Sequence, residues 1–250
     1  MLAEMAPRLP LYRLIEDELR REIFTAIDMQ GFFVPASREE SSEICLVGVS
    51  PAPGITPSLF DDVELQVLSR CSEVIGSYYV GRIEVTDIRR TGASDDARAC
   101  DLTASFFGYA SPFPFAGDFW RKWAAERRPA LGEWKKYPIE AHDSWLHVVQ
   151  TAWFGAGRSA IRYSEKSQYE IDGGDVASMA SFYCALGEAV NGPGGYFGSN
   201  LDALADCLSR SEPFLLAWRD SGAARESLGS AEFSSIIDTL REFKITVVFR

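Results

Sequence analysis

The chain has 250 residues, which fits one large domain or two of ordinary size. It is 46% hydrophobic and 24% charged, as soluble globular proteins are, so a largely disordered chain is excluded. Its 36 acidic and 25 basic residues give a net charge of −11, a poor match to the clustered Lys and Arg of a general nucleic-acid binder. The acidity suits a soluble protein with a basic partner, or it only maintains solubility.

The cysteines are odd in number, widely spaced and without a CxxC pair: Cys45, Cys71, Cys100, Cys184 and Cys207. This pattern indicates neither a disulfide framework nor a zinc ribbon, and reduced thiols are typical of a cytoplasmic protein. No apolar run approaches the ~20 residues that span a membrane, and the N-terminus lacks a signal-peptide pattern. We therefore expect a cytoplasmic protein that makes no membrane contact.

The first 166 residues predict a mixed, β-rich domain. Strands are expected at residues 11–15, 23–27, 32–34, 44–49, 78–88 and 102–109. The first two flank the charged stretch EDELRRE, which is typical of a hairpin. Helices are expected at 117–128 and 139–154. The small, polar and charged segment 155–167 is interpreted as the domain boundary, near residue 166.

Candidate chemistry in this part of the chain is sparse. His142 and His147 stand near Glu140 and Asp143, but a separation of five residues does not place both imidazoles on one helical face as HExxH does. Satisfied polar residues are the simpler interpretation, and no metal site is predicted. No nucleophile elbow, P-loop or kinase motif is present, so no cofactor and no catalytic residue is predicted, although a Cys–His nucleophile pair stays open.

A second pattern combines tryptophan with basic residues: Trp120, Trp123 and Trp134 alternate with Arg121, Lys122, Arg127, Arg128, Lys135 and Lys136. Basic groups beside stacking aromatics are the composition of an RNA surface. Trp120 and Trp123 are three residues apart on an expected helix, however, which is typical of a core-facing stripe. A further alternative is that these basic residues bind the acidic C-terminal part of the same chain. The favoured role of residues 1–166 is an accessory domain that supports the rest or binds a second protein partner.

The charge is concentrated at the C-terminal end. Residues 167–250 hold 12 acidic and 6 basic residues, a net of −6, whereas residues 1–166 hold 24 and 19, a net of −5. Apolar strands in QYEIDG, FLLAW and ITVVF are separated by helical patterns at 179–190, 201–208 and 231–243. Strands that alternate with helices predict a small α/β domain with a three-stranded parallel sheet.

The helix at 201–208 is amphipathic. Leu201, Leu204 and Leu208 lie on one face, while Asp202 and Asp206, four residues apart, share another. Taken alone, such a pair of acids is an ordinary solvated helix face. The glycine-rich loop GPGGYFG precedes this helix but lacks the spacing of a phosphate-binding motif.

Residues 168–250 resemble the barstar family of intracellular ribonuclease inhibitors. EIDGGDVASMASFYCALGEAV matches the first strand, turn and first helix of the family. YFGSNLDALADCL matches its signature Tyr-Tyr-Gly-Glu-Asn-Leu-Asp-Ala-Leu-Trp-Asp-Cys-Leu in most positions. PFLLAW and LREF…ITVVF match the second strand, the last helix and the last strand. The resemblance covers the last third of the chain and nothing before it.

This resemblance implies that the protein is not an enzyme but an immunity-type inhibitor, which plugs the active site of a basic, toxin-like ribonuclease. The partner-binding residues that it implies are Tyr196 and Gly198 at the rim, Asn200 and Leu201 at the helix start, Asp202 against a basic residue, Asp206 in the phosphate pocket, and Glu242 on the last helix. A carboxylate suits this role because a ribonuclease site stabilises an anionic phosphoryl group with cations.

Several departures from the family concern the partner rather than the fold. Ala205 stands where the family commonly has Trp, Ser199 replaces a Glu and Phe197 replaces a Tyr, while the connection from Cys207 to Pro213 is about two residues shorter. Since aromatics and charges dominate interface energetics, a different cognate ribonuclease or a weakened contact is predicted, rather than barnase itself. Two alternatives are an enzyme with its activity in residues 1–165 and a two-module interaction adaptor.

Overall fold

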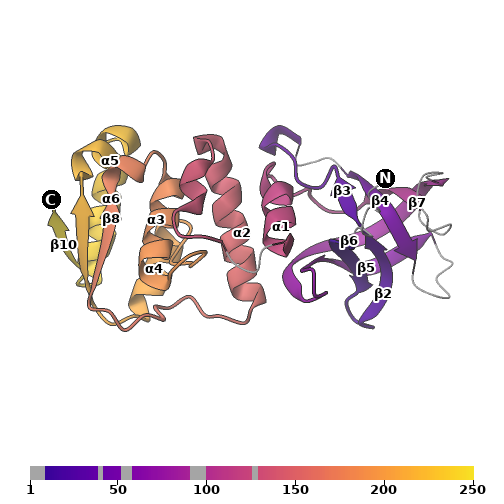
Figure 1. Ribbon diagram of the computed structural model, residues 1–250, viewed down its shortest axis with the longest axis horizontal. Helices are drawn as coiled ribbons and strands as arrows, with labels where there is room; N and C mark the ends of the chain where they lie inside the picture. Colours follow the sequence, from indigo (N-terminus) through magenta and orange to yellow (C-terminus); the bar gives the residue numbers. More distant parts are fainter. Residues whose placement is uncertain (1–8, 39–41, 52–57, 91–99, 126–128) are drawn as a thin grey trace, which may run out of the picture. The chain divides into compact units, whose positions relative to one another are not determined.

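The computed structural model describes residues 9–38, 42–51, 58–90, 100–125 and 129–250 (Figure 1). The chain divides into two compact units, Met1–Arg127 and Arg128–Arg250. The sequence predicts a boundary near residue 166, whereas in the structure the described residues 129–166 belong to the C-terminal unit. The physical reason is the helix at His142–Gly155, which packs against the helix at Met179–Asn191 of the same unit.

The N-terminal unit is built on a seven-stranded antiparallel sheet. Its strands are β1 (Tyr12–Glu16), β2 (Arg21–Ala26), β3 (Asp28–Gln30), β4 (Glu43–Pro51), β5 (Leu59–Leu68), β6 (Val74–Arg90) and β7 (Cys100–Phe106). They run in the order β2-β1-β5-β6-β7-β4-β3, and β2 also pairs with β4. The sheet therefore closes into a barrel, which removes most of its open edges.

The expected β-rich character of this unit is confirmed, with local differences. The stretch EDELRRE does join two antiparallel strands, β1 and β2. Residues 32–34 are not a strand, since Phe33 makes only an isolated bridge to Ser111. The expected helix is α1 (Ala116–Ala125), which packs on β5, and the rest of its expected span, 126–128, lies outside the described residues.

The C-terminal unit contains the expected three-stranded parallel sheet, in the order β10-β9-β8. Its strands are β8 (Gln168–Asp172), β9 (Leu215–Arg219) and β10 (Thr246–Phe249). Its helices are α2 (His142–Gly155), α3 (Met179–Asn191), α4 (Leu201–Ser209), α5 (Ser221–Leu228) and α6 (Ser230–Glu242). Within this unit α3 packs on β8, α4 packs on α6, and α5 packs on α6.

Helix α3 is buried on two opposite sides. Its start is fixed by a capping box in which the hydroxyl of Ser178 accepts from the backbone N–H of Ser181. On one side Phe182 stacks on Trp218 of the central strand, with ring centroids 5.4 Å apart. On the other side α3 packs against α2, and Cys184 is buried. A helix with buried residues on two sides needs cover on both, and α2 supplies the second.

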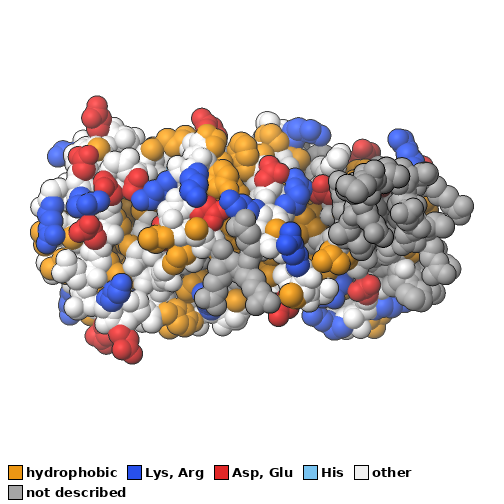
Figure 2. All heavy atoms as spheres, viewed as in Figure 1, with side chains coloured by type: hydrophobic (Ala, Val, Ile, Leu, Met, Phe, Trp, Pro, Cys, Tyr) orange, Lys and Arg blue, Asp and Glu red, His pale blue; other side chains and the backbone are white. Residues whose placement is uncertain are grey.

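The surface in view in Figure 2 carries acidic and basic side chains side by side, with hydrophobic side chains exposed between them. None of the helices in the described part of the chain combines the length and the apolar character needed to cross a bilayer.

Candidate functional site

Helix α4 is held rigidly at its start and along its inner face. The Asn200 side chain caps the helix by accepting from the backbone N–H of Ala203 at 2.8 Å. Leu204, Cys207 and Leu208 are buried beneath the helix. The residues expected to start the helix therefore do so, with Asn200 exposed and Leu201 half-buried.

The outer face of α4 presents the two expected carboxylates. Asp202 and Asp206 are both exposed and lie one helical turn apart. Asp206 pairs with Arg210, the C-cap residue of α4, with 3.3 Å between Oδ1 and Nε, and both side chains are about half exposed. An exposed pair of this kind contributes about 0–1 kcal/mol, so a partner cation can replace Arg210 at little cost.

The third expected carboxylate lies on the neighbouring helix. Glu242 is the last residue of α6 and is exposed. Because α4 and α6 pack against each other, the three predicted acids belong to two adjacent helices of one module.

The glycines of the loop before α4 permit close packing inside the unit. A Cβ on Gly195 would stand 2.7 Å from the carbonyl oxygen of Gly187 on α3. Gly198 has φ of +101°, and a Cβ there would lie 2.9 Å from the Cα of Leu204. Both glycines are buried, so the backbone around Gly198 rests on α4 instead of lining an open rim.

Tyr196 differs most from its expected role at the rim. Its side chain is only 2% exposed, and its ring lies edge-on to Phe154 of α2 with centroids 5.2 Å apart. Its hydroxyl is 3.4 Å from the Oγ of Ser199, and burial raises the pKa of the phenol. The expectation came from a resemblance that begins after α2, so the helix that covers Tyr196 lay outside it.

Asn191, the last residue of α3, connects the loop to the segment after α2. Its Nδ2 donates to the carbonyl oxygens of Ile161 at 3.1 Å and Tyr196 at 2.7 Å. Its Oδ1 accepts from the backbone N–H of Tyr163 at 2.8 Å. Three hydrogen bonds from one amide fix the loop against residues 161–163.

Buried thiols and phenols surround this region. Burial raises the pKa of Cys207 to about 12 and raises the pKa of Cys184 further. The same cause raises the pKa of Tyr183, whose buried hydroxyl has no hydrogen-bond partner among the described residues. These thiols are small apolar core residues rather than nucleophiles.

The histidines pack among helices of the C-terminal unit. The ring of His142 lies edge-on to Trp134 at 5.2 Å, with Nε2 3.2 Å from the carbonyl oxygen of Tyr137. His147 is half-buried on α2, and desolvation lowers its pKa to about 4. Among the residues that the structure covers, His, Cys, Asp and Glu form no group of three or more suited to a metal ion.

The tryptophans of the basic–aromatic pattern are split between the units. Trp120 is buried in the N-terminal unit and donates to the hydroxyl of Tyr78 at 2.8 Å. Trp134 is buried in the C-terminal unit and donates to Glu188 at 3.2 Å. Buried rings are not available for base stacking. Arg121 pairs with two carboxylates and Lys135 with one, while Arg127 and Arg128 lie outside the described residues.

Comparison with known families identifies the module. Residues 167–247 match the sequence model of the family Barstar, described as barstar (barnase inhibitor). This confirms the resemblance for the C-terminal third of the chain. In a comparison with curated proteins the chain matches none of them.

Proposed function

We propose, on the premise that residues 167–247 are barstar-like, that this protein inhibits a basic ribonuclease by binding rather than by catalysis. It acts as a cytoplasmic immunity-type protein, or antitoxin, whose acidic helix α4 occupies the active site of a toxin-like enzyme. The compact unit Met1–Arg127 serves as an accessory domain for a second protein partner.

The observation that carries this proposal is the exposed Asp206 on a rigid helix. Among the residues that the structure describes, its carboxylate forms a surface ion pair with Arg210, which a stronger cation of a partner can replace. A ribonuclease binds the phosphoryl group of its substrate with Arg and Lys, and such a site attracts a carboxylate. Because the cap at Asn200 and the buried face of α4 fix the helix, little conformational entropy is lost on binding.

The charge of the module supports fast encounter with such an enzyme. The excess of 12 acidic over 6 basic residues in 167–250 attracts a basic surface at long range. The attraction between exposed charges falls over a Debye length of about 8 Å at physiological salt, so association should slow as salt is added.

The test is inhibition of RNA cleavage by the full chain, measured against a panel of purified barnase-type ribonucleases that includes barnase. For each enzyme that is inhibited, Asp206→Ala should raise the inhibition constant by roughly 30-fold or more, equivalent to about 2 kcal/mol. Asp202→Ala should raise it less.

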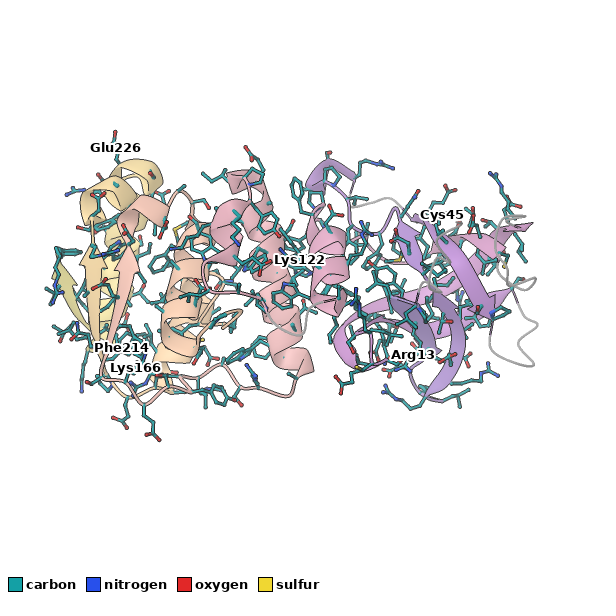
Figure 3. All side chains as sticks on the ribbon, viewed as in Figure 1. Arg13, Cys45, Lys122, Lys166, Phe214 and Glu226 are labelled. Carbon is teal, nitrogen blue, oxygen red and sulfur yellow. The ribbon has the colours of Figure 1, made fainter. Side chains whose placement is uncertain are left out.

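The matched control is Glu226→Ala, which removes one exposed acid from α5 and should leave the inhibition constant unchanged. Figure 3 labels Glu226 on this helix, which packs on α6. If Asp206→Ala behaves like Glu226→Ala, the acidic face of α4 is not the binding surface. If no ribonuclease of the panel is inhibited, the interaction-adaptor alternative gains support.

A further inference from the structure

An aromatic residue of α2 takes the outward position over the loop that leads into the acidic helix. Phe154 is 44% exposed, whereas Tyr196, on which its ring packs, is 2% exposed. Any macromolecule that approaches this part of the surface meets the ring of Phe154 and not the phenol beneath it. The exposed aromatic surface here is thus supplied from outside the barstar-like region.

The ring of Phe154 is both accessible and firmly held. The residues that follow it, Gly155, Ala156 and Gly157, are small and exposed, so no large side chain from them covers its outer face. The preceding residue, Trp153, is buried and donates from Nε1 to the carbonyl oxygen of Ser159 at 2.9 Å. A ring on a fixed backbone contributes contact area at low cost in conformational entropy.

Phe154 is also continuous with the proposed inhibitory surface. Tyr196 bridges the two, because its ring contacts Phe154 and its hydroxyl lies 3.4 Å from Ser199. Ser199 directly precedes the Asn200 cap of α4. Burial raises the pKa of the Tyr196 phenol, and the negative charge of Asp206 acts in the same direction. One tyrosine side chain therefore spans the space between the exposed ring and the acidic helix.

We propose that Phe154 is a partner-contacting and specificity-determining residue, on which the ribonuclease packs while α4 occupies its active site. This inference rests on the proposed inhibitory function and extends its surface to α2. The chemistry fits an enzyme whose phosphate-binding site is rimmed by Arg or Lys, because cations bind both to carboxylates and to the face of an aromatic ring. Interfaces of this kind take much of their binding energy from a few aromatic anchors.

The arrangement selects among ribonucleases by shape as well as by charge. A partner must leave room for the end of α2, and it must offer an apolar or cationic surface where Phe154 stands. A ribonuclease fitted to an uncovered Tyr196 would collide with Phe154, which gives a physical reason for a cognate enzyme other than barnase.

The experiment measures inhibition by the full chain of the ribonuclease that it inhibits most tightly in the panel above. Phe154→Ala should raise the inhibition constant at least tenfold. Ile139→Ala is the matched control, because Ile139 is 43% exposed just before the other end of α2, and it should change the constant less than twofold. The two sites are about 20 Å apart along the helix axis, at 1.5 Å per residue. Thermal unfolding of each variant checks that the fold is kept.

A second variant covers the case in which Phe154→Ala loosens the loop. Phe154→Lys keeps an aliphatic stem over Tyr196 but places a positive charge toward a basic partner, so it should also weaken inhibition at least tenfold. If either folded variant inhibits as well as the unchanged chain, or better, Phe154 is only a cover and the inference is overturned. Asp206→Ala separates the two proposals. If Asp206→Ala weakens inhibition and the Phe154 variants do not, only the inference about Phe154 is overturned. If Asp206→Ala has no effect on inhibition, the proposed function itself is overturned.

Discussion

At the scale of single residues, the carboxylate of Glu188 on α3 binds the segment that precedes α2, at Gly132 and Trp134. Its two oxygens accept from the backbone N–H of Gly132 at 2.8 Å and from the Nε1 of Trp134 at 3.2 Å. Burial raises its pKa, and the two hydrogen bonds act in the opposite direction. Removing this half-buried acceptor is costly, since the buried indole N–H of Trp134 and the half-buried backbone N–H of Gly132 then lack a partner.

Glu188→Ala should accordingly lower the free energy of unfolding by about 1–3 kcal/mol, measured by urea denaturation. Glu188→Gln keeps one carbonyl acceptor and should lose less. Glu226→Ala, an exposed change on α5, should stay within about 0.5 kcal/mol of the unchanged protein. Equal stability of Glu188→Ala and Glu226→Ala would show that these hydrogen bonds contribute nothing to folding.

His147 makes stability depend on pH with a defined sign. Burial lowers its pKa from 6.5 to about 4, so the unfolded chain binds a proton more readily than the folded chain. The contribution of the neutral imidazole is complete above pH 6.5 and is lost as the pH falls toward 4. Between pH 7 and pH 5 this loss amounts to up to about 2 kcal/mol.

His147→Gln should flatten the fall in stability over that interval, while its effect at pH 7 reports the loss of the neutral imidazole and its contacts. The measurement is the free energy of unfolding in urea at pH 7, 6 and 5. The same decline in both proteins would mean that His147 is not the group that titrates.

At the scale of elements, the sequence predicts best where local pattern and packing agree. The parallel strands and the helices α3, α4 and α6 follow from apolar periodicity, and the family match agrees with them. Strand β5 was missed because Asp61 and Asp62 interrupt its apolar pattern where the pairing with β6 shifts register. Helix α5 was missed because SGAARESL has little apolar character and buries only Ala224.

Burial of the candidate site depends on packing between segments far apart in the chain, which no local pattern reports. The exposure of Asp202, Asp206 and Glu242 follows from their helical positions and agrees with the structure. The burial of Tyr196 depends on Phe154, 42 positions earlier in an aromatic-rich stretch. Apolar periodicity predicts that an aromatic residue such as Phe154 packs against another part of the protein. It does not predict which loop Phe154 covers, because that depends on the tertiary fold.

At the scale of the whole molecule, the family match and the compact unit have different limits. The match begins at residue 167, whereas the compact unit begins at Arg128. The intervening segment covers the second side of α3, shields Tyr196, and is fixed through Glu188 and Asn191. The smallest piece that buries its own apolar surface should therefore start near residue 128.

Two truncated chains test this. Residues 128–250 should unfold cooperatively, because the core of this unit is complete. Their free energy of unfolding and their inhibition constant should be close to those of the same unit in the full chain. Residues 167–250 should be less stable by about 3 kcal/mol or more, since losing α2 uncovers α3 and Tyr196, and each large apolar side chain contributes about 1.5–3 kcal/mol. The free energy of unfolding of both pieces is measured by circular dichroism during a urea titration.

Equal stability of the two pieces would show that α2 does not stabilise the barstar-like module. If residues 128–250 did not fold alone, the N-terminal unit would belong to the same folding unit. The first outcome would also remove the structural basis for a role of Phe154, because a helix that does not stabilise the module has no fixed place beside Tyr196 in the loop before α4.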